Sequence, residues 1–231
     1  YFMKKLILFI FTGLFLFSLQ AETRIERYFE NTDYELNVYH INGKEPGKTL
    51  MIIGGIQGDE SGGYLTADLY VDTILEKGNL IIVPRANVPT IVQNKRQITK
   101  DMNRRFDEQK SSIYEDEVVE ILKGLINKSD ILLNLHEGGG YFRETYIDKM
   151  HNPLKFGQCI IADADSFYSE TRSKMICLGD IAREICKNAN PHINNEDYIF
   201  RFNNHNTVSA DTKHIEQRKS ATYYGLTQAG I

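Results

Sequence analysis

The sequence predicts an α/β protein in which a mostly parallel sheet carries helices on both faces. Three observations favour this class. Short continuous apolar runs have the length and composition of strands that are buried on both faces. Amphipathic segments of helical period alternate with these runs along the chain. Glycine, asparagine and proline end several runs, as expected where the chain turns between elements.

The expected elements of the first half follow in chain order. A strand over 34–41 ends at an Asn-Gly turn signal. A second strand over 49–53 (TLMII) ends in two glycines. A helix is expected over 61–76, where leucine and valine recur at helical spacing and acidic residues alternate with them. A third strand over 79–83 (NLIIV) ends at a proline, which cannot continue a central strand.

The second half repeats the alternation of strand and helix. An amphipathic helix is expected over 113–126, followed by a buried strand over 130–135 (DILLNL). A weaker strand over 158–162 precedes a helix near 174–186, and a further helix-like run occupies 216–229. In open α/β sheets, ligands bind beyond the carboxyl ends of the strands. Polar residues directly after the strands are therefore the candidate functional residues.

Residues 1–21 have the pattern of a secretory signal peptide. Met3 is followed by Lys4 and Lys5, then by an apolar run over 6–19. A single membrane anchor is the alternative, but the run is shorter than the ~20 residues that a spanning helix needs. We therefore expect export, a mature domain over 22–231, and no integral membrane span after signal cleavage.

Charge and cysteine content exclude other classes. Lys and Arg total 27 against 31 Asp and Glu, which gives a net charge of -4 without a basic block. A nucleic-acid partner is therefore not expected. Three cysteines are too few for a disulfide framework. Cys177 and Cys186 lie too far apart along one expected helix to pair, and whether Cys159 pairs with either is left open.

Two polar clusters follow two of the expected strands. Gln57 and Glu60 come after the strand over 49–53, and His136 comes after the strand over 130–135. Nitrogen and oxygen ligands of this kind bind zinc, and a catalytic zinc site uses three of them. The alternative is that the first two are polar groups at a helix N-terminus and His136 is a structural histidine. A phosphate-binding loop is disfavoured because no Lys-Ser/Thr follows the glycines.

This pattern resembles the zinc carboxypeptidase superfamily, and the resemblance extends from Thr49 to about Leu226. It implies a central mixed, mostly parallel sheet and a Zn²⁺ ion. Metal ligands are implied at Gln57, Glu60 and His136. The stretch over 94–106 (NKRQITKDMNRRF) is similar to the superfamily's Arg followed seven residues later by Asn-Arg. The resemblance places Arg96 at the position that polarises the scissile carbonyl, and Asn103 and Arg104 at the pair that grips the substrate's terminal carboxylate.

Glutamine in place of the first metal-binding histidine makes the resemblance more specific. Gln57 together with Glu60 and His136 is similar to peptidoglycan D,L-carboxypeptidases that determine helical cell shape. This implies a periplasmic enzyme that acts on peptidoglycan muropeptides, trims tripeptide to dipeptide, and releases the terminal diaminopimelate. Two alternatives stay open: an amidohydrolase resembling aspartoacylase or succinylglutamate desuccinylase, and a cell-wall-binding module without catalysis.

The superfamily also needs a carboxylate general base, which lies shortly after a helix. The run over 216–229 resembles the element before that base, and the sequence stops at Ile231. We therefore expect a fold truncated at the C-terminus, with the base beyond residue 231. For Glu137 we expect a supporting role beside His136.

Overall fold

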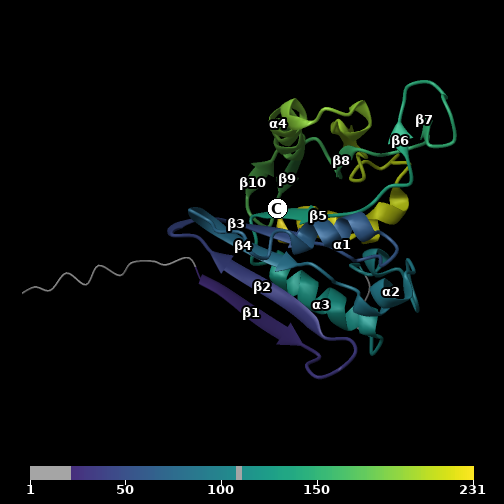
Figure 1. Cartoon of the computed structure of the whole chain (residues 1–231). Coiled ribbons are helices and arrows are strands. Elements are labelled where there is room, and N and C mark those ends of the chain that lie inside the picture. The colour runs from purple at the N-terminus through teal and green to yellow at the C-terminus, as the bar shows by residue number, and fades with distance from the viewer. Residues whose placement is uncertain (1–21, 108–110) are drawn as a thin grey trace, which may run out of the picture.

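The structure, a computed structural model, describes residues 22–107 and 111–231, shown in Figure 1. The expected signal peptide over 1–21 lies outside the described residues. The strands are β1 Glu22–Tyr28, β2 Leu36–Asn42, β3 Glu45–Ile53, β4 Lys77–Val83, β5 Ile131–Asn134, β6 Tyr141–Phe142, β7 His151–Asn152, β8 Cys159–Ala162, β9 Phe167–Ser169, β10 Lys174–Ile176 and β11 Arg201–Asn204. The α-helices are α1 Ser61–Asp68, α2 Val88–Gln93, α3 Tyr114–Ile126, α4 Leu178–Ala189 and α5 Ala221–Tyr224. Short 3₁₀ or π turns are η1 Met102–Arg104, η2 Asn190–His192, η3 Glu196–Tyr198, η4 Ile215–Lys219 and η5 Gly225–Ala229.

The central sheet has five strands in the order β1-β2-β4-β3-β5. Strands β4, β3 and β5 run parallel to one another, whereas β1 and β2 are added antiparallel at one edge. The sheet is therefore mixed, and the expected α/β class with a mixed central sheet is confirmed. The expected strands over 34–41, 49–53, 79–83 and 130–135 all belong to this sheet.

Helices cover both faces of the central sheet, as expected. Alternate residues of a strand point to opposite faces, so Met51 and Ile53 of β3 face one layer and Ile52 faces the other. On the first face, α3 supplies a buried stripe that packs on the strands. On the second face, Ala67 of α1 packs against Ile52. The buried stripe of α3 consists of Val118, Val119, Leu122, Leu125 and Ile126.

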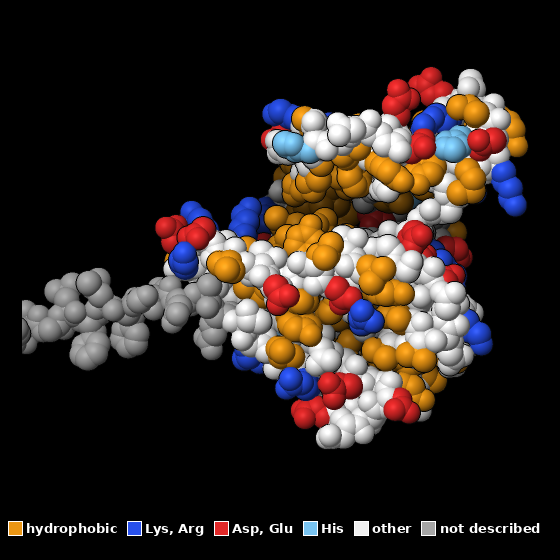
Figure 2. All heavy atoms as spheres, in the orientation of Figure 1, with side chains coloured by type: hydrophobic (Ala, Val, Ile, Leu, Met, Phe, Trp, Pro, Cys, Tyr) orange, Lys and Arg blue, Asp and Glu red, His pale blue; other side chains and the backbone are white. Residues whose placement is uncertain are grey.

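A smaller lobe stands beside the edge of the sheet formed by β5 (Figure 1). It contains the parallel pair β8 and β11, the pair β6 and β7, and the pair β9 and β10, with α4 against β8 and β11. A groove with a volume of about 220 Å³ separates β5 from this lobe, and Figure 2 shows it as a hollow with apolar walls. The expected strand over 158–162 thus exists, but it lies outside the central sheet.

Three expected helices differ from the structure. The helix expected over 61–76 ends at Asp68. Leu69, which would continue its apolar face, is 80% exposed, whereas Val71 and Leu75 still pack on the core from the non-helical chain that follows. The helix expected near 174–186 starts only at Leu178, after strand β10. The helix-like run over 216–229 is divided into η4, α5 and η5.

All three cysteines are free thiols in the structure. Cys177 is exposed, and Cys159 and Cys186 are half-buried. Within the part of the chain that the structure describes, we find no helix with the length and apolar character needed to span a membrane.

Candidate active site

The carboxyl ends of β3 and β5 lie side by side and bring the candidate residues together. Ile53 at the end of β3 pairs with Asn134 at the end of β5. Helix α1 follows β3 and packs closely on the chain at the end of β5. The approach is so close that a Cβ atom at Gly63 would lie only 2.6 Å from the carbonyl oxygen of Leu135. Glycine at this position therefore allows the amino end of α1 to contact the chain that follows β5. Glu60 directly precedes α1 and His136 follows β5, so the two residues are brought together.

Glu60 and His136 are in direct contact. The Nδ1 atom of His136 lies 2.7 Å from Oε2 of Glu60, and the backbone N–H of Glu137 donates to the same oxygen at 3.2 Å. The other oxygen of Glu60 accepts a hydrogen bond from Arg96 at 3.1 Å. The Glu60 side chain is only 14% exposed, whereas that of Arg96 is 45% exposed. Two expected metal ligands and the expected catalytic arginine thus form one cluster.

Gln57 is joined to this cluster through Asp101, a residue that the sequence analysis did not single out. Gln57 is 2% exposed, and its Nε2 atom donates to the two carboxylate oxygens of Asp101 at 2.9 and 3.1 Å. Asp101 also accepts from Arg96 at 3.0 and 3.2 Å. Because a carboxylate only accepts, it selects the amide nitrogen of Gln57 and leaves Oε1 for another partner. Among the described residues, no hydrogen bond reaches that oxygen.

Asn103 and Arg104 lie on the turn η1 beside the cluster. Asn103 is 5% exposed, and its Nδ2 atom lies 3.4 Å from Nε2 of His136. Its Oδ1 atom accepts from the backbone N–H of Ala221 at 3.0 Å. Arg104 is half-buried and donates to the carbonyl oxygen of Asn103 at 2.8 Å. The structure therefore gives Asn103 a contact with His136 that sequence reasoning did not foresee, whereas the substrate-binding roles of both residues stay predictions.

The carboxylate of Glu137 is bound at the amino end of α1. Its Oε2 atom accepts from the backbone N–H of Gly62 at 2.6 Å and from the hydroxyl of Ser61 at 3.2 Å. Unpaired N–H groups at a helix N-terminus favour a negatively charged acceptor of this kind. The sequence analysis expected a supporting role beside His136, and the contacts show that Glu137 supports α1.

This geometry predicts that Glu137→Ala lowers stability more than turnover. Loss of a side chain that satisfies helix N-terminal N–H groups costs about 1 kcal/mol. We expect a lower midpoint of thermal unfolding and turnover within about threefold of wild type, measured on the full-length protein. The exposed Glu144, replaced by alanine, is the matched control. Complete loss of turnover in Glu137→Ala without unfolding would instead identify this residue as the general base.

The donor set fits a zinc site only if Gln57 is included. Over residues 22–107 and 111–231, no group of three or more His, Cys, Asp and Glu side chains could hold a metal ion. With Gln57, the cluster offers one carboxylate, one imidazole and one carboxamide oxygen, which are ligand types that zinc accepts. The free Oε1 atom of Gln57 is the observation that favours this fit.

A pair of stacked histidines lies in the smaller lobe, apart from the candidate site. The rings of His205 and His214 are stacked with centroids 3.8 Å apart and planes 4° apart. Burial lowers the pKa of His205 to about 4, with a further contribution from the charge of His214. His205 is therefore neutral at ordinary pH. No contact connects this pair to Glu60 or His136 among the described residues.

The mixed sheet with helices on both faces gives the class of protein, an α/β protein whose fold is of the zinc carboxypeptidase-like kind. The particular family follows from a comparison with family models. The chain belongs to the family described as carboxypeptidase controlling helical cell shape, catalytic, whose model matches residues 3–230.

Solved structures of the cell shape determinant protein Csd4 from Helicobacter pylori are similar to this chain. The product-bound and the tripeptide-bound structures are each 29% identical, with a TM-score of 0.67, and cover 90% of this chain and 47% of that one. The mDAP-bound form, described as a D,L-carboxypeptidase, is 32% identical with a TM-score of 0.67 and covers 78% of this chain and 42% of that one. The chain thus spans less than half the length of these relatives. A search of curated proteins found no match.

Proposed function

We propose that this chain is the catalytic part of an exported, zinc-dependent D,L-carboxypeptidase that trims peptidoglycan tripeptide to dipeptide and releases diaminopimelate. The observation that carries the proposal is the cluster of Glu60, His136 and Arg96 at the strand ends of a chain that belongs to the cell-shape carboxypeptidase family. The relative Csd4 has structures with bound product, tripeptide and mDAP, which supports a muropeptide substrate.

Gln57, Glu60 and His136 would hold the zinc ion. When bound, zinc would supply a Lewis acid that polarises a carbonyl group and activates water for attack. Glutamine and histidine are both neutral ligands, so Gln57 leaves the charge of the site unchanged relative to a histidine. Asp101 accepts from the amide nitrogen of Gln57, which leaves Oε1 for the metal, and Asn103 contacts Nε2 of His136. Such partners orient metal ligands.

Arg96 and Arg104 would act on the substrate. Arg96 is already placed against Glu60, and its partly exposed guanidinium can donate to a carbonyl oxygen as negative charge develops there. Arg104 would bind the terminal carboxylate of the peptide through two parallel hydrogen bonds, the geometry that a guanidinium favours. Asn103 would add a polar contact beside it.

The proposal includes the location of the protein. Residues 1–21 would direct export and be removed, and residues 22–231 would form the catalytic domain in the periplasm. Glu137 is not proposed as the general base, because its carboxylate is already engaged at the amino end of α1.

Asp101→Asn tests the orientation of Gln57. We expect zinc affinity to fall 10- to 100-fold, the usual effect of removing a group that orients a metal ligand. The uncharged amide can offer either its oxygen or its nitrogen to Gln57, so the Oε1 atom is no longer selected. Competition with a chelating dye measures the affinity. Asp59→Asn makes the same charge change at an exposed position in the loop that carries Gln57, and it should bind zinc as wild type does. Equal affinities for the two variants would contradict the role given to Asp101.

The function itself is tested with the full-length protein and purified muropeptides. We expect conversion of tripeptide to dipeptide and release of diaminopimelate, with loss of both products when zinc is removed by a chelator and recovery when zinc is restored. Mass spectrometry identifies the products. Binding of muropeptides without any product would favour a cell-wall-binding module, and hydrolysis of acylated amino acids instead of muropeptides would favour an amidohydrolase. Either result would refute the proposal.

A further inference from the structure

The loop over residues 94–100, here called the arginine loop, carries Arg96 between helix α2 and the turn η1. Every residue of the loop is exposed. A cavity of about 450 Å³ lies beside it, with Ile98 and Thr99 of the loop and Glu115 of α3 among the lining residues. Close packing therefore does not hold the loop in place, and its hydrogen bonds have to determine its path.

Two sets of backbone hydrogen bonds hold the arginine loop. At its start, the N–H of Lys95 donates to the carbonyl oxygen of Thr90 at 2.9 Å, and the carbonyl of Lys95 accepts from Gly58 at 3.1 Å. At its end, the N–H groups of Thr99 and Lys100 both donate to Oε1 of a single side chain, Glu115, at 3.0 and 3.2 Å. Arg96 lies between these two anchors.

The position of Glu115 in its own helix does not explain why its side chain is buried. It is 3% exposed in the first turn of α3, where the helix dipole favours acidic residues even when they are exposed. Glu117 of the same turn is only half-buried. Burial of a carboxylate is unfavourable unless hydrogen bonds compensate for the lost water. Those bonds come from the arginine loop, and Oε2 of Glu115 has no hydrogen-bond partner among the described residues.

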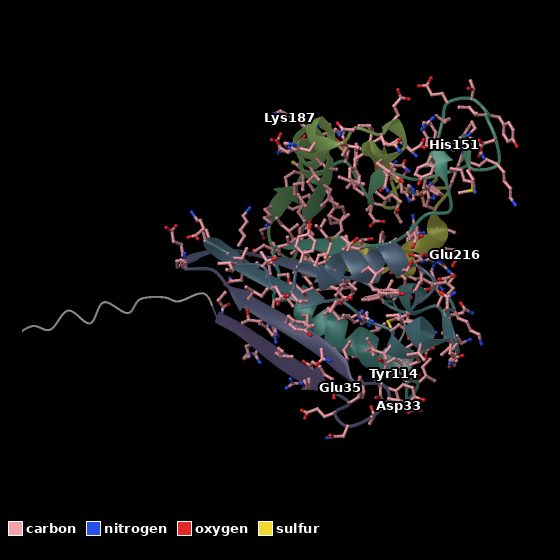
Figure 3. The ribbon with its side chains drawn as sticks, viewed as in Figure 1. Asp33, Glu35, Tyr114, His151, Lys187 and Glu216 are labelled. Carbon is pink, nitrogen blue, oxygen red and sulfur yellow. The ribbon has the colours of Figure 1, made fainter. Side chains whose placement is uncertain are left out.

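The amino end of α3 is itself held firmly. The ring of Tyr114, directly before Glu115, lies against the rings of Phe29 and Tyr34, and its hydroxyl donates to the carbonyl oxygen of Tyr34 at 3.4 Å. Figure 3 shows Tyr114 beside Asp33, at the end of α3 that approaches the turn between β1 and β2. The side chain of Glu115 therefore extends from a well-packed helix end to the exposed arginine loop.

From these contacts we infer that Glu115 is a positioning residue, which holds the arginine loop so that Arg96 points at Glu60 and Asp101. The inference rests on the proposed function for the role of Arg96 in turnover. Its structural part does not, because the hydrogen bonds from Arg96 to Asp101 can be observed without any substrate.

Three variants of the full-length protein separate the hydrogen bonds from packing and charge. Glu115→Met fills the same space without an acceptor, whereas Glu115→Gln keeps one carbonyl oxygen, which is all that the two N–H groups use. Glu117→Met is the matched control in the same turn. Hydrogen exchange measured by NMR reports on the amides of Thr99 and Lys100 and on the Nε–H of Arg96.

We expect exchange at these three sites to accelerate at least tenfold in Glu115→Met, while the amides of α3 stay protected. Turnover of tripeptide should fall at least tenfold through kcat, with KM and zinc content close to wild type, because misplaced catalytic groups chiefly lower the rate of reaction. Glu115→Gln should restore both properties, and Glu117→Met should resemble wild type. If Glu115→Met does not fold, Glu115→Asp provides the same test, because it withdraws the acceptor by one methylene.

Unchanged exchange in Glu115→Met would overturn the inference whether or not the protein cleaves muropeptides. Accelerated exchange with wild-type kcat would also overturn it, since Arg96 would then not depend on the loop. A wild-type protein that releases no diaminopimelate would refute the proposed function alone, and exchange at the Nε–H of Arg96 would then decide the inference.

Discussion

His136→Ala should abolish zinc binding, whereas Gln57→His should keep or tighten it. His136 offers the one imidazole of the proposed site, and its Nδ1 atom already touches Glu60. Without it, a carboxylate and a carboxamide remain, which is one ligand fewer than catalytic zinc sites use. Imidazole is a better zinc ligand than an amide oxygen. A histidine at position 57 could also donate a ring N–H to Asp101, as the Gln57 amide does now.

Metal content after exhaustive dialysis measures this effect. Wild type and Gln57→His should each retain about one zinc ion per chain, and His136→Ala should retain almost none. His192→Ala removes an exposed histidine from η2 and should retain the metal. Thermal unfolding confirms that each variant is folded. Full retention of zinc by a folded His136→Ala variant would refute the proposed metal site.

Arg104→Lys should lose most of the activity toward tripeptide although the positive charge is kept. The proposed contact with the terminal carboxylate needs two parallel N–H donors, and lysine offers a single ammonium point. A hydrogen bond to a charged group contributes about 1.5–3 kcal/mol, so kcat/KM should fall by about 10- to 100-fold. A small loss of stability is also expected, because Arg104 donates to the carbonyl oxygen of Asn103.

Comparison with a second arginine separates binding from general effects. Arg85 pairs with Asp68 on the surface, and its side chain is 48% exposed. Arg85→Lys should therefore leave kcat/KM unchanged. A substrate that lacks the terminal carboxylate should be cleaved poorly by wild type and equally poorly by Arg104→Lys. Turnover of tripeptide by Arg104→Lys close to wild type would argue against the assignment.

Local pattern was sufficient to predict the centre of the fold. The apolar runs that became β3 and β4 are covered by helices on both faces, so they show no polar alternation and are easily recognised. The run that became β5 was recognised in the same way, but it is an edge strand and its residues are only half-buried. Because parallel strands end at a common edge, Glu60 and His136 could be expected to meet although 76 residues separate them. The residue at which the helix after Glu60 ends could not be predicted, because it depends on whether another segment covers Leu69, and in the structure Leu69 is exposed.

Residue pattern along the chain is enough to predict the α/β class, the strand ends and the residue types of the candidate site. Which groups orient those residues depends on contacts between distant segments. Asp101 and Glu115 carry no motif, and their importance arises from contacts with Gln57, Arg96 and the arginine loop. The same holds for the smaller lobe, where β8 pairs with β11 rather than with β5. The physical reason is that such contacts form between segments brought together by packing, and periodicity along one segment carries no information about a distant one.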